Sequence, residues 1–282
     1  MGSIVFKLYR YQILPISKQY DLRFSLEDVI ANKNRLFAES LMKINPESSS
    51  TSKINYRITI EENTLSKFLL VISREKNVKY YRKDHVKDII PSFPPAYILI
   101  DNANDIQIIA VQNTIEYSST EQIIKVLIDR INAKIKYMNL YVKYSSIYRE
   151  SSFWKFVENH KNEIAYVYFE IITPNMSSIS KNLSDDFKRI AKATNAVSTK
   201  YKIQANMDSH LNIDRDNRDI AGLADYTSRG GGESKIKLRG TKIDFRSNDF
   251  QLQVEIPEID IPRNYSNLLE KIVGEVYNGS DR

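Results

Sequence analysis

Residues 226–240 read YTSRGGGESKIKLRG, and this stretch holds four of the chain's eight glycines. Glycine is so rare elsewhere that none occurs between Gly2 and Gly222. A helical pattern of apolar residues precedes the stretch at 215–228, so a helix has to end here. Glycine tolerates the left-handed backbone conformation that ends many helices. The sequence therefore predicts a helix, a glycine turn with at least one positive φ, and then a strand.

The predicted strand alternates basic and apolar residues. Lys235, Lys237 and Arg239 fall on one face, and Ile236 and Leu238 fall on the other. Backbone amides at a glycine turn, next to three cations, are suited to hold a phosphate. We therefore predict that an anion, most simply nucleic acid, contacts the following residues: Arg229, Gly230, Gly231, Gly232, Lys235, Lys237, Arg239 and Lys242.

An alternative interpretation of the same stretch needs no ligand. The glycines then only end the helix, and the basic face of the strand is solvated. The sequence predicts two hairpin arms, at 234–245 and 250–256. In this interpretation Gln251, Gln253 and Glu255 of the second arm pair with the cations across the sheet.

A second alternative is a Mg²⁺-dependent nuclease of the PD-(D/E)xK type. Its carboxylates hold Mg²⁺, and its lysine stabilises the attacking water or the scissile phosphate. Asp225, Glu233 and Lys235 have a compatible spacing. Two features count against this interpretation. Glu233 follows three glycines rather than apolar strand residues, and Asp225 lies in a helical pattern. Whether the protein is an enzyme stays open at this point.

Two further stretches mix tyrosine with lysine and arginine, a combination that suits single-stranded nucleic acid. They are REKNVKYYRKDHVK at 74–87 and KIKYMNLYVKYSSIYR at 134–149. The chain has 18 tyrosines, so part of this clustering is expected by chance.

The composition is that of a globular protein, with 42% apolar and 27% charged residues. A net charge of +6 permits an anionic partner without demanding one. No apolar run is long enough to span a membrane, and the first residues show no signal-peptide pattern, so we expect a cytoplasmic protein. The long span without glycine leaves no place for a Walker loop or a Rossmann turn. Cysteine is absent and the three histidines are scattered, so we expect no metal or cofactor, Mg²⁺ in the nuclease alternative excepted.

Apolar periodicity predicts an α+β fold, with mixed or antiparallel sheets and flanking helices. The clearest elements are a buried strand at 4–14 and a long helix at 119–138, capped by Ser119 or Thr120. The other predicted strands are 54–60, 67–73, 96–101, 106–112, 139–145, 163–172 and 197–205, and the other predicted helices are 25–44, 151–160, 181–194, 215–228 and 266–277. A polar segment near 145–152 indicates two subdomains, 1–147 and 148–282, the second carrying the basic hairpin.

Three features stand out in the C-terminal half: a strand ending in Thr-Pro-Asn at 173–175, a helix ending in Asn-Ala at 195–196, and the Tyr-x-Ser-x-Gly-Gly-Gly turn at 226–232. In these features it resembles uncharacterised bacterial proteins of about this size that are scattered among mobile and phage-defence islands. The resemblance implies a cytoplasmic component of a bacterial defence or toxin system that works with a partner subunit. No chemistry is implied by it.

Together these observations favour a component of an anti-phage defence or toxin system that binds nucleic acid or a partner subunit through a basic C-terminal sheet. The alternatives are the Mg²⁺-dependent nuclease, and a structural subunit with no role at nucleic acid.

Overall fold

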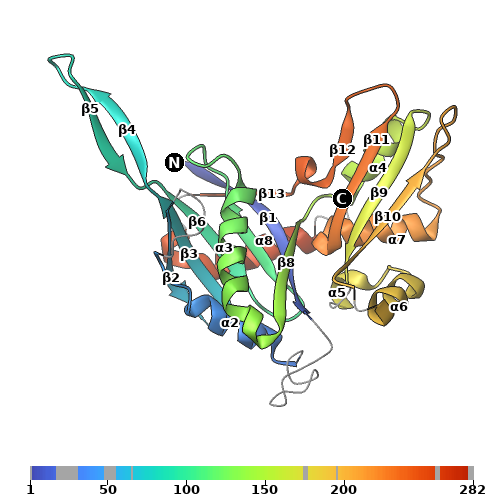
Figure 1. Cartoon of the computed structure of the whole chain (residues 1–282), viewed down its shortest axis with the longest axis horizontal. Helices are drawn as coiled ribbons and strands as arrows, with labels where there is room; N and C mark the ends of the chain where they lie inside the picture. Colours follow the sequence, from blue (N-terminus) through green and yellow to red (C-terminus); the bar gives the residue numbers. More distant parts are fainter. Residues whose placement is uncertain are drawn as a thin grey trace.

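The computed structural model confirms an α+β fold, and all of its described strand pairs are antiparallel. It describes residues 2–16, 31–47, 55–64, 66–173, 177–194, 196–257 and 261–278. The first part of the predicted helix at 25–44 lies outside these residues. The described chain forms two lobes, each with its own sheet and core, and a thin ribbon that projects from the first lobe (Figure 1).

The first lobe is a large antiparallel sheet in the order β13-β1-β7-β6-β3-β2. Its strands are β1 (Ser3–Pro15), β2 (Tyr56–Asn63), β3 (Lys67–Arg74), β6 (Pro95–Asp101), β7 (Ile108–Gln112), β8 (Leu140–Ser146) and β13 (Gln253–Pro257). β1 is long because it serves two partners in succession. Residues 3–7 pair with β13, and residues 9–15 pair with β8. The predicted strand at 4–14 is confirmed.

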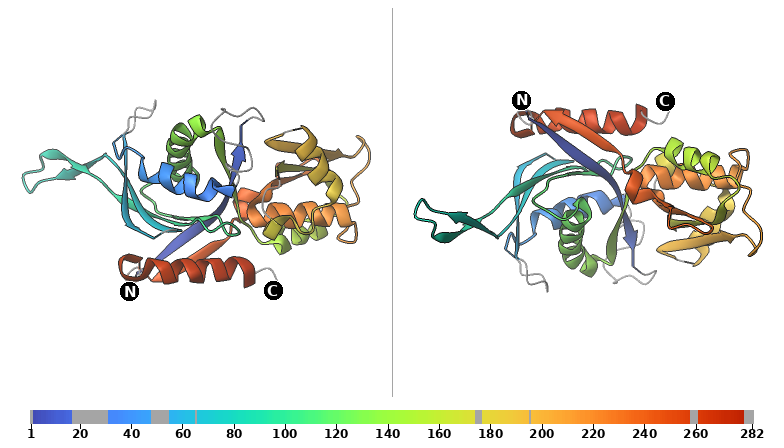
Figure 2. Two further views of the ribbon diagram at one scale, coloured as in Figure 1. Left: turned by 90° about the horizontal axis from the view of Figure 1, so that it is seen from below. Right: turned by 90° about the horizontal axis from the view of Figure 1, so that it is seen from above.

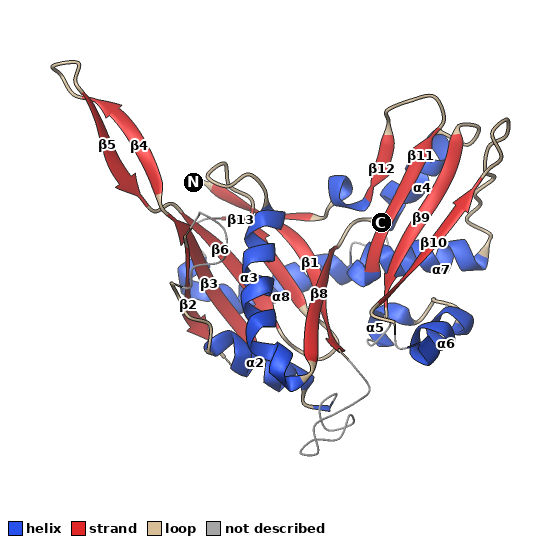
Figure 3. Ribbon diagram, viewed as in Figure 1, coloured by secondary structure: helices blue, strands red, loops and turns tan. Residues whose placement is uncertain are grey.

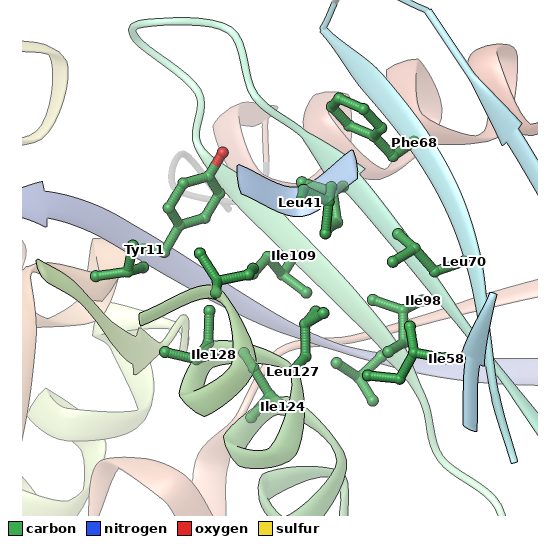
Figure 4. Close-up of a cluster of buried hydrophobic side chains, with 14 of the residues drawn as sticks. Tyr11, Leu41, Ile58, Phe68, Leu70, Ile98, Ile109, Ile124, Leu127 and Ile128 are labelled. Atoms are coloured by element: carbon green, nitrogen blue, oxygen red, sulfur yellow. The ribbon is translucent and has the colours of Figure 1, made fainter. Parts of the chain in front are cut away.

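Helices cover both faces of this sheet. α2 (Lys33–Met42) and α3 (Thr120–Ile135) pack on one face, and α8 (Ile261–Asn278) packs on the other. Ser119 caps α3 by accepting a hydrogen bond from the Gln122 amide at 3.2 Å, which confirms one of the two predicted caps. In Figure 4, Ile124, Leu127 and Ile128 of α3 point toward the sheet. Each such side chain stabilises the fold by about 1.5–3 kcal/mol on burial.

The second lobe is a smaller antiparallel sheet in the order β10-β9-β11-β12. Its strands are β9 (Ile164–Ile172), β10 (Ser198–Gln204), β11 (Gly232–Leu238) and β12 (Asp244–Arg246). Its helices are α4 (Glu150–Asn159), α5 (Ser177–Ser180), α6 (Asp185–Thr194) and α7 (Arg218–Tyr226). Apolar residues of α4 and α7 pack on one face of this sheet, around Phe169 and Ile236. In Figure 2, α4 and α7 lie on the same side of the molecule as α8, whereas α3 lies on the opposite side.

α7 begins later than the sequence predicted. Its N-cap is Asn217, whose side chain accepts hydrogen bonds from the amides of Asp219 and Ile220. This cap satisfies two of the helix's free backbone donors. In the loop before α7, Asp214 accepts a hydrogen bond from the Asp216 amide at 3.0 Å.

Of the predicted hairpin arms at 234–245 and 250–256, the first is confirmed and the pairing of the second is wrong. β11 does turn back into β12, where Lys235 pairs with Arg246 and Lys237 pairs with Asp244. The second arm, however, is β13, which pairs with β1 in the other lobe and places Glu255 opposite Val5. The predicted pairing of the β11 cations with Gln251, Gln253 and Glu255 is therefore not formed.

The chain thus returns to its first lobe at the end. β13 completes the edge of the first sheet, and α8 covers that sheet's back face with Leu269 and Ile272. The predicted subdomains, 1–147 and 148–282, differ from this arrangement because residues 253–257 and 261–278 pack with the first of them. Sequence polarity near 145–152 marks where the chain leaves the first lobe, but nothing local marks its return.

A ribbon of two strands that the sequence did not predict projects from the first lobe. β4 (Lys76–Tyr81) and β5 (Lys87–Ser92) pair only with each other (Figure 3). Every residue of β4 is exposed. We call residues 76–92 the arm.

Candidate nucleic-acid interface

β11 has the predicted alternation of buried and accessible residues. Ile236 and Leu238 are buried against the helices, whereas Lys235 is exposed and Lys237 is half-buried. Because cross-strand partners share a face of a sheet, the register places other side chains beside these lysines. Lys235 is opposite Tyr168 of β9, and Lys237 is opposite Tyr166.

The whole face that α4 and α7 leave uncovered can be assigned from the register in the same way. We call it the open face. It is formed by Tyr166, Tyr168, Glu170, Lys200, Lys202, Gln204, Glu233, Lys235, Lys237, Asp244 and Arg246. Cations outnumber carboxylates on it. It looks toward the same side of the molecule as α3, as Figure 2 shows.

Two tyrosine rings of the open face each lie beneath a lysine. The Lys202 Nζ is 4.5 Å from the centre of the Tyr166 ring, and the Lys235 Nζ is 5.7 Å from that of Tyr168. Burial and the neighbouring charge of Glu170 raise the pKa of Tyr168 to about 12. A tyrosine hydroxyl is already neutral at physiological pH and does not repel a phosphate, and this shift moves its ionisation further away.

Some charges of the open face are already paired within the protein. Lys237 Nζ lies 2.6 Å from Asp244 Oδ1, and Lys143 of β8 lies 2.5 Å from Glu170 Oε1. Burial alone would raise the pKa of Glu170, but the hydrogen bond and charge of Lys143 hold it below its ordinary value. Lys235 has only a long contact, 3.7 Å, with Glu233. Lys200 is held as loosely, with its Nζ 3.9 Å from Glu170 Oε2, so Lys200, Lys202 and Lys235 are the lysines most easily released to a ligand.

Arg239 and Lys242, which the sequence grouped with these lysines, lie outside the open face. β11 ends at Leu238, where the register with β9 shifts. Arg239 NH2 donates to the backbone carbonyls of Asn206 and Ser209, so this arginine anchors the loop after β10. Lys242 is exposed in the turn that leads to β12.

The three glycines are buried, and Gly230 lies in the seam between the lobes, against Arg10 of β1. Gly230 has φ 82°, which confirms the predicted positive φ. A Cβ on Gly230 would lie 2.5 Å from the Cβ of Arg10 in β1, and one on Gly232 would lie 1.8 Å from the Glu170 carbonyl oxygen. Gly231 is pressed in the same way against the ring of Tyr226. The glycines therefore serve close packing, and the structure does not present them to a ligand alongside Lys235.

Residues 227–231 form a π-helical turn that ties the lobes together. Arg10 is fully buried and donates from Nε to the Arg229 carbonyl at 2.7 Å. The Tyr148 hydroxyl bonds both the Thr227 hydroxyl at 2.8 Å and the Ser234 hydroxyl at 2.7 Å. Buried polar groups need such partners, because an unpaired one costs about 1–3 kcal/mol.

The structure does not bring Asp225 together with Glu233 and Lys235. Asp225 is buried on α7, where its carboxylate accepts hydrogen bonds from Arg229 at 2.7 Å and from Asn182 at 3.1 Å. Glu233 and Lys235 lie on the open face, on the other side of the sheet from α7. Within the part of the chain that the structure describes, no cluster of three or more His, Asp or Glu residues is arranged to hold a metal ion.

A groove of about 300 Å³ continues the open face toward the first lobe. It runs between α3 and β8 on one side and the start of β11 on the other. Tyr141, Lys143 and Tyr144 line it from β8, and Glu121, Lys125 and Asp129 line it from α3. The three from β8 belong to the tyrosine-rich stretch at 134–149. The same stretch also supplies Tyr148 to the buried seam, so only part of it faces solvent.

Sequence reasoning missed Tyr166, Tyr168, Lys200 and Lys202 as site residues. The signal was present in two strands, since AYVYFE at 165–170 and TKYKIQ at 199–204 both alternate. What the sequence does not show is that these strands flank each other and β11, with their polar faces on one side.

No protein-family model matches this chain, and no curated protein matches it. No helix among the described residues has the length and apolar character needed to cross a membrane.

Proposed function

We propose that the protein binds single-stranded nucleic acid on the open face of its second sheet. The observation that carries the proposal is the pair of tyrosine rings, Tyr166 and Tyr168, each beneath a lysine ammonium on an uncovered sheet. Bases stack on aromatic side chains with about 1–3 kcal/mol per base, and nearby lysines neutralise the phosphates.

The lysine over each ring does not block this use. An exposed cation–π contact is worth about 0.5–1 kcal/mol, so Lys202 and Lys235 can swing to a phosphate at small cost. The ring face that each one leaves is then free for a base. The same two side chains thus supply both parts of a single-strand site.

The groove lined by Tyr141, Lys143 and Tyr144 extends the open face in one direction. A strand that crosses β10, β9 and β11 reaches the groove at Glu233. Glu170 and Glu233 lie there, so the repulsion of phosphates is strongest at this end. We infer that the bound strand lies mainly over β9 and β10, where Lys200 and Lys202 are found.

The test is fluorescence anisotropy with labelled single strands of about 15 nucleotides, at several salt concentrations. Tyr166→Leu and Tyr168→Leu keep apolar bulk but remove the ring, and each should weaken binding roughly tenfold. Lys202→Gln with Lys235→Gln should lower the log–log salt slope by about 1.4, which is about 0.7 for each lost phosphate contact.

Matched controls lie outside the open face. Tyr137 is 69% exposed in the turn after α3, and Lys271 is exposed on α8. Tyr137→Leu and Lys271→Gln should leave affinity and slope unchanged. Equal losses in the controls and in the open-face variants, or a wild type that does not bind single strands, would overturn the proposal.

Nothing in the geometry favours the nuclease over binding, because Asp225 is committed to Arg229 and Asn182. A setting in phage defence, and a partner subunit, stay predictions that rest on the resemblance of residues 173–232.

A further inference from the structure

The arm is the most exposed part of the described chain, and it has no covering layer on either face. Val78, Tyr81, Ile89 and Ile90 are 45, 69, 56 and 50% exposed. An isolated two-stranded hairpin is marginally stable in water, and exposed apolar side chains of this size commonly mark a binding surface. Figure 1 shows the arm extending away from both lobes.

The register of the arm sorts its charges onto two different faces. One face carries Lys76, Val78, Tyr80, Asp88 and Ile90. The other, which we call the cationic face, is formed by Asn77, Lys79, Tyr81, Lys87, Ile89 and Pro91, and it contains no carboxylate.

Charges on the first face are neutralised within the protein. Arg82 Nε lies 3.0 Å from Asp88 Oδ2, and Tyr80 donates to the same carboxylate at 3.1 Å. Lys76 Nζ lies 2.7 Å from Glu116 Oε2 at the base of the arm. On the cationic face, by contrast, Lys79 and Lys87 form no ion pair with any described residue.

Unpaired lysines beside exposed apolar groups fit a polyanion better than a protein surface. Packing Lys79 and Lys87 against neutral protein would strip their water without compensation. Phosphates supply that compensation, while Tyr81 and Ile89 can lie against sugars or thymine methyl groups. The cationic face is therefore complementary in charge to nucleic acid.

The shape of the arm distinguishes duplex from single strand. The arm is a projecting two-stranded ribbon without flanking elements, so it cannot surround a single strand, but it can enter a groove. The major groove of B-DNA, about 12 Å wide, admits a two-stranded ribbon. Six residues of each strand extend for about 20 Å, which is enough to cross it.

We propose that the arm docks in the groove of duplex nucleic acid, with Lys79 and Lys87 on the phosphates. This site shares no residue with the open face and does not depend on single-strand binding there. The two surfaces bind in different ways. A single strand lies on the flat open face, whereas the arm inserts into a groove of the duplex.

The experiment uses the full chain and a blunt duplex of about 20 base pairs, titrated at three or more salt concentrations. Lys79→Gln with Lys87→Gln should lower the log–log salt slope by about 1.8, which is about 0.9 for each lost phosphate contact. The matched control is Lys76→Gln with Arg82→Gln, which removes the same charge from the opposite face and should leave the slope unchanged. Melting temperatures should agree among all three proteins, because the arm contributes nothing to either core.

Three results would overturn the proposal. One is a wild type that does not bind the duplex. Another is an equal change of slope in both double variants, which would show an effect of net charge alone. The third is that the wild type forms a concentration-dependent dimer in sedimentation, that Tyr81→Ala abolishes this dimer, and that the Tyr81→Ala variant still binds the duplex. That result would show that a second copy of the chain occupies the arm. Single strands titrated in parallel report on the open face separately, so either proposal can fail alone.

Discussion

Residues 226–232 and residues 233–238 are adjacent in sequence and opposite in environment. The first segment, with its three glycines, is buried between the lobes, and a side chain on any of those glycines would collide with neighbours. The second is the rest of β11 after Gly232, and it presents Glu233, Lys235 and Lys237 to the open face. The sequence predicted one anion site made of both segments. In the structure the first segment connects the two lobes, and we call it the joint, whereas the second segment forms part of an accessible surface.

This difference shows that a glycine row has two physical meanings. Glycine admits a ligand close to the backbone, and it equally admits another part of the same protein. Here Arg10, Tyr226 and Glu170 occupy the space that a phosphate would need. Substitutions in the first segment should therefore change stability, and those in the second should change binding.

The largest expected effect is at Gly230. Gly230→Ala places a Cβ 2.5 Å from that of Arg10, in a conformation with φ 82° that disfavours side chains. Strain of about 1–2 kcal/mol and overpacking of about 1–3 kcal/mol should together lower the free energy of unfolding by roughly 3 kcal/mol. Urea denaturation measures this loss.

Gly240 provides the control for that prediction. It also has a positive φ, 68°, but nothing lies within 4 Å of the position of its Cβ. Gly240→Ala should therefore cost only the backbone strain, about 1 kcal/mol. Equal losses of unfolding free energy at Gly230 and Gly240 would show that packing in the seam contributes nothing to stability. The proposed difference between the two segments would then be wrong.

Tyr148 sharpens the comparison because its hydroxyl touches both segments. Tyr148→Phe removes the bonds to Thr227 in the turn and to Ser234 in β11, while the ring stays in the core. We expect a loss of about 1–2 kcal/mol in unfolding free energy, with single-strand affinity unchanged. A changed affinity with unchanged stability would mean that the joint and the surface are not separate.

The smallest effect concerns Glu170, whose carbonyl abuts Gly232 and whose side chain lies on the open face. Burial works against the charged form, but the hydrogen bond and charge of Lys143 hold the pKa of Glu170 below its ordinary value of 4.5. A lowered pKa stabilises the fold above about pH 4.5, and this contribution is lost as the pH falls through the folded pKa. At pH 7 the free energy of unfolding of the wild type should exceed that of Glu170→Gln by roughly 1 kcal/mol.

The difference between those two proteins should shrink as the pH falls below 4.5 and should vanish once Glu170 is protonated in the folded protein, as chemical denaturation at each pH can show. Comparing the two proteins cancels the titration of all other carboxylates. A gap that stays constant between pH 7 and pH 3 would mean that the ion pair with Lys143 does not form.

Local patterns were enough to predict most elements of the fold. Alternation of apolar and polar residues located β9 and β11, and apolar residues spaced three or four apart located α3 with its cap at Ser119. Each of these patterns depends only on residues within one element. The arm was missed because both of its faces are exposed, so β4 shows no alternation of apolar and polar residues.

The partners of each strand could not be predicted, and neither could the site. β13 has the same alternating pattern whether it pairs with β11 or with β1, and only long-range packing decides. The lysines of β11 were found because they follow a conspicuous turn. Tyr166 and Lys202 were missed because a face made of several strands is defined by register, which no single segment reveals.

The return of β13 and α8 to the first lobe has a consequence during synthesis on the ribosome. After β8 emerges, the ribosome must still add the roughly 110 residues up to β13, which takes on the order of 10 seconds. Until then the first half of β1 lacks its edge partner, and Phe6, Leu8 and Leu99 lack the helix that covers them. The nascent first lobe therefore exposes the apolar residues of its back face to solvent for as long as the second lobe is being made.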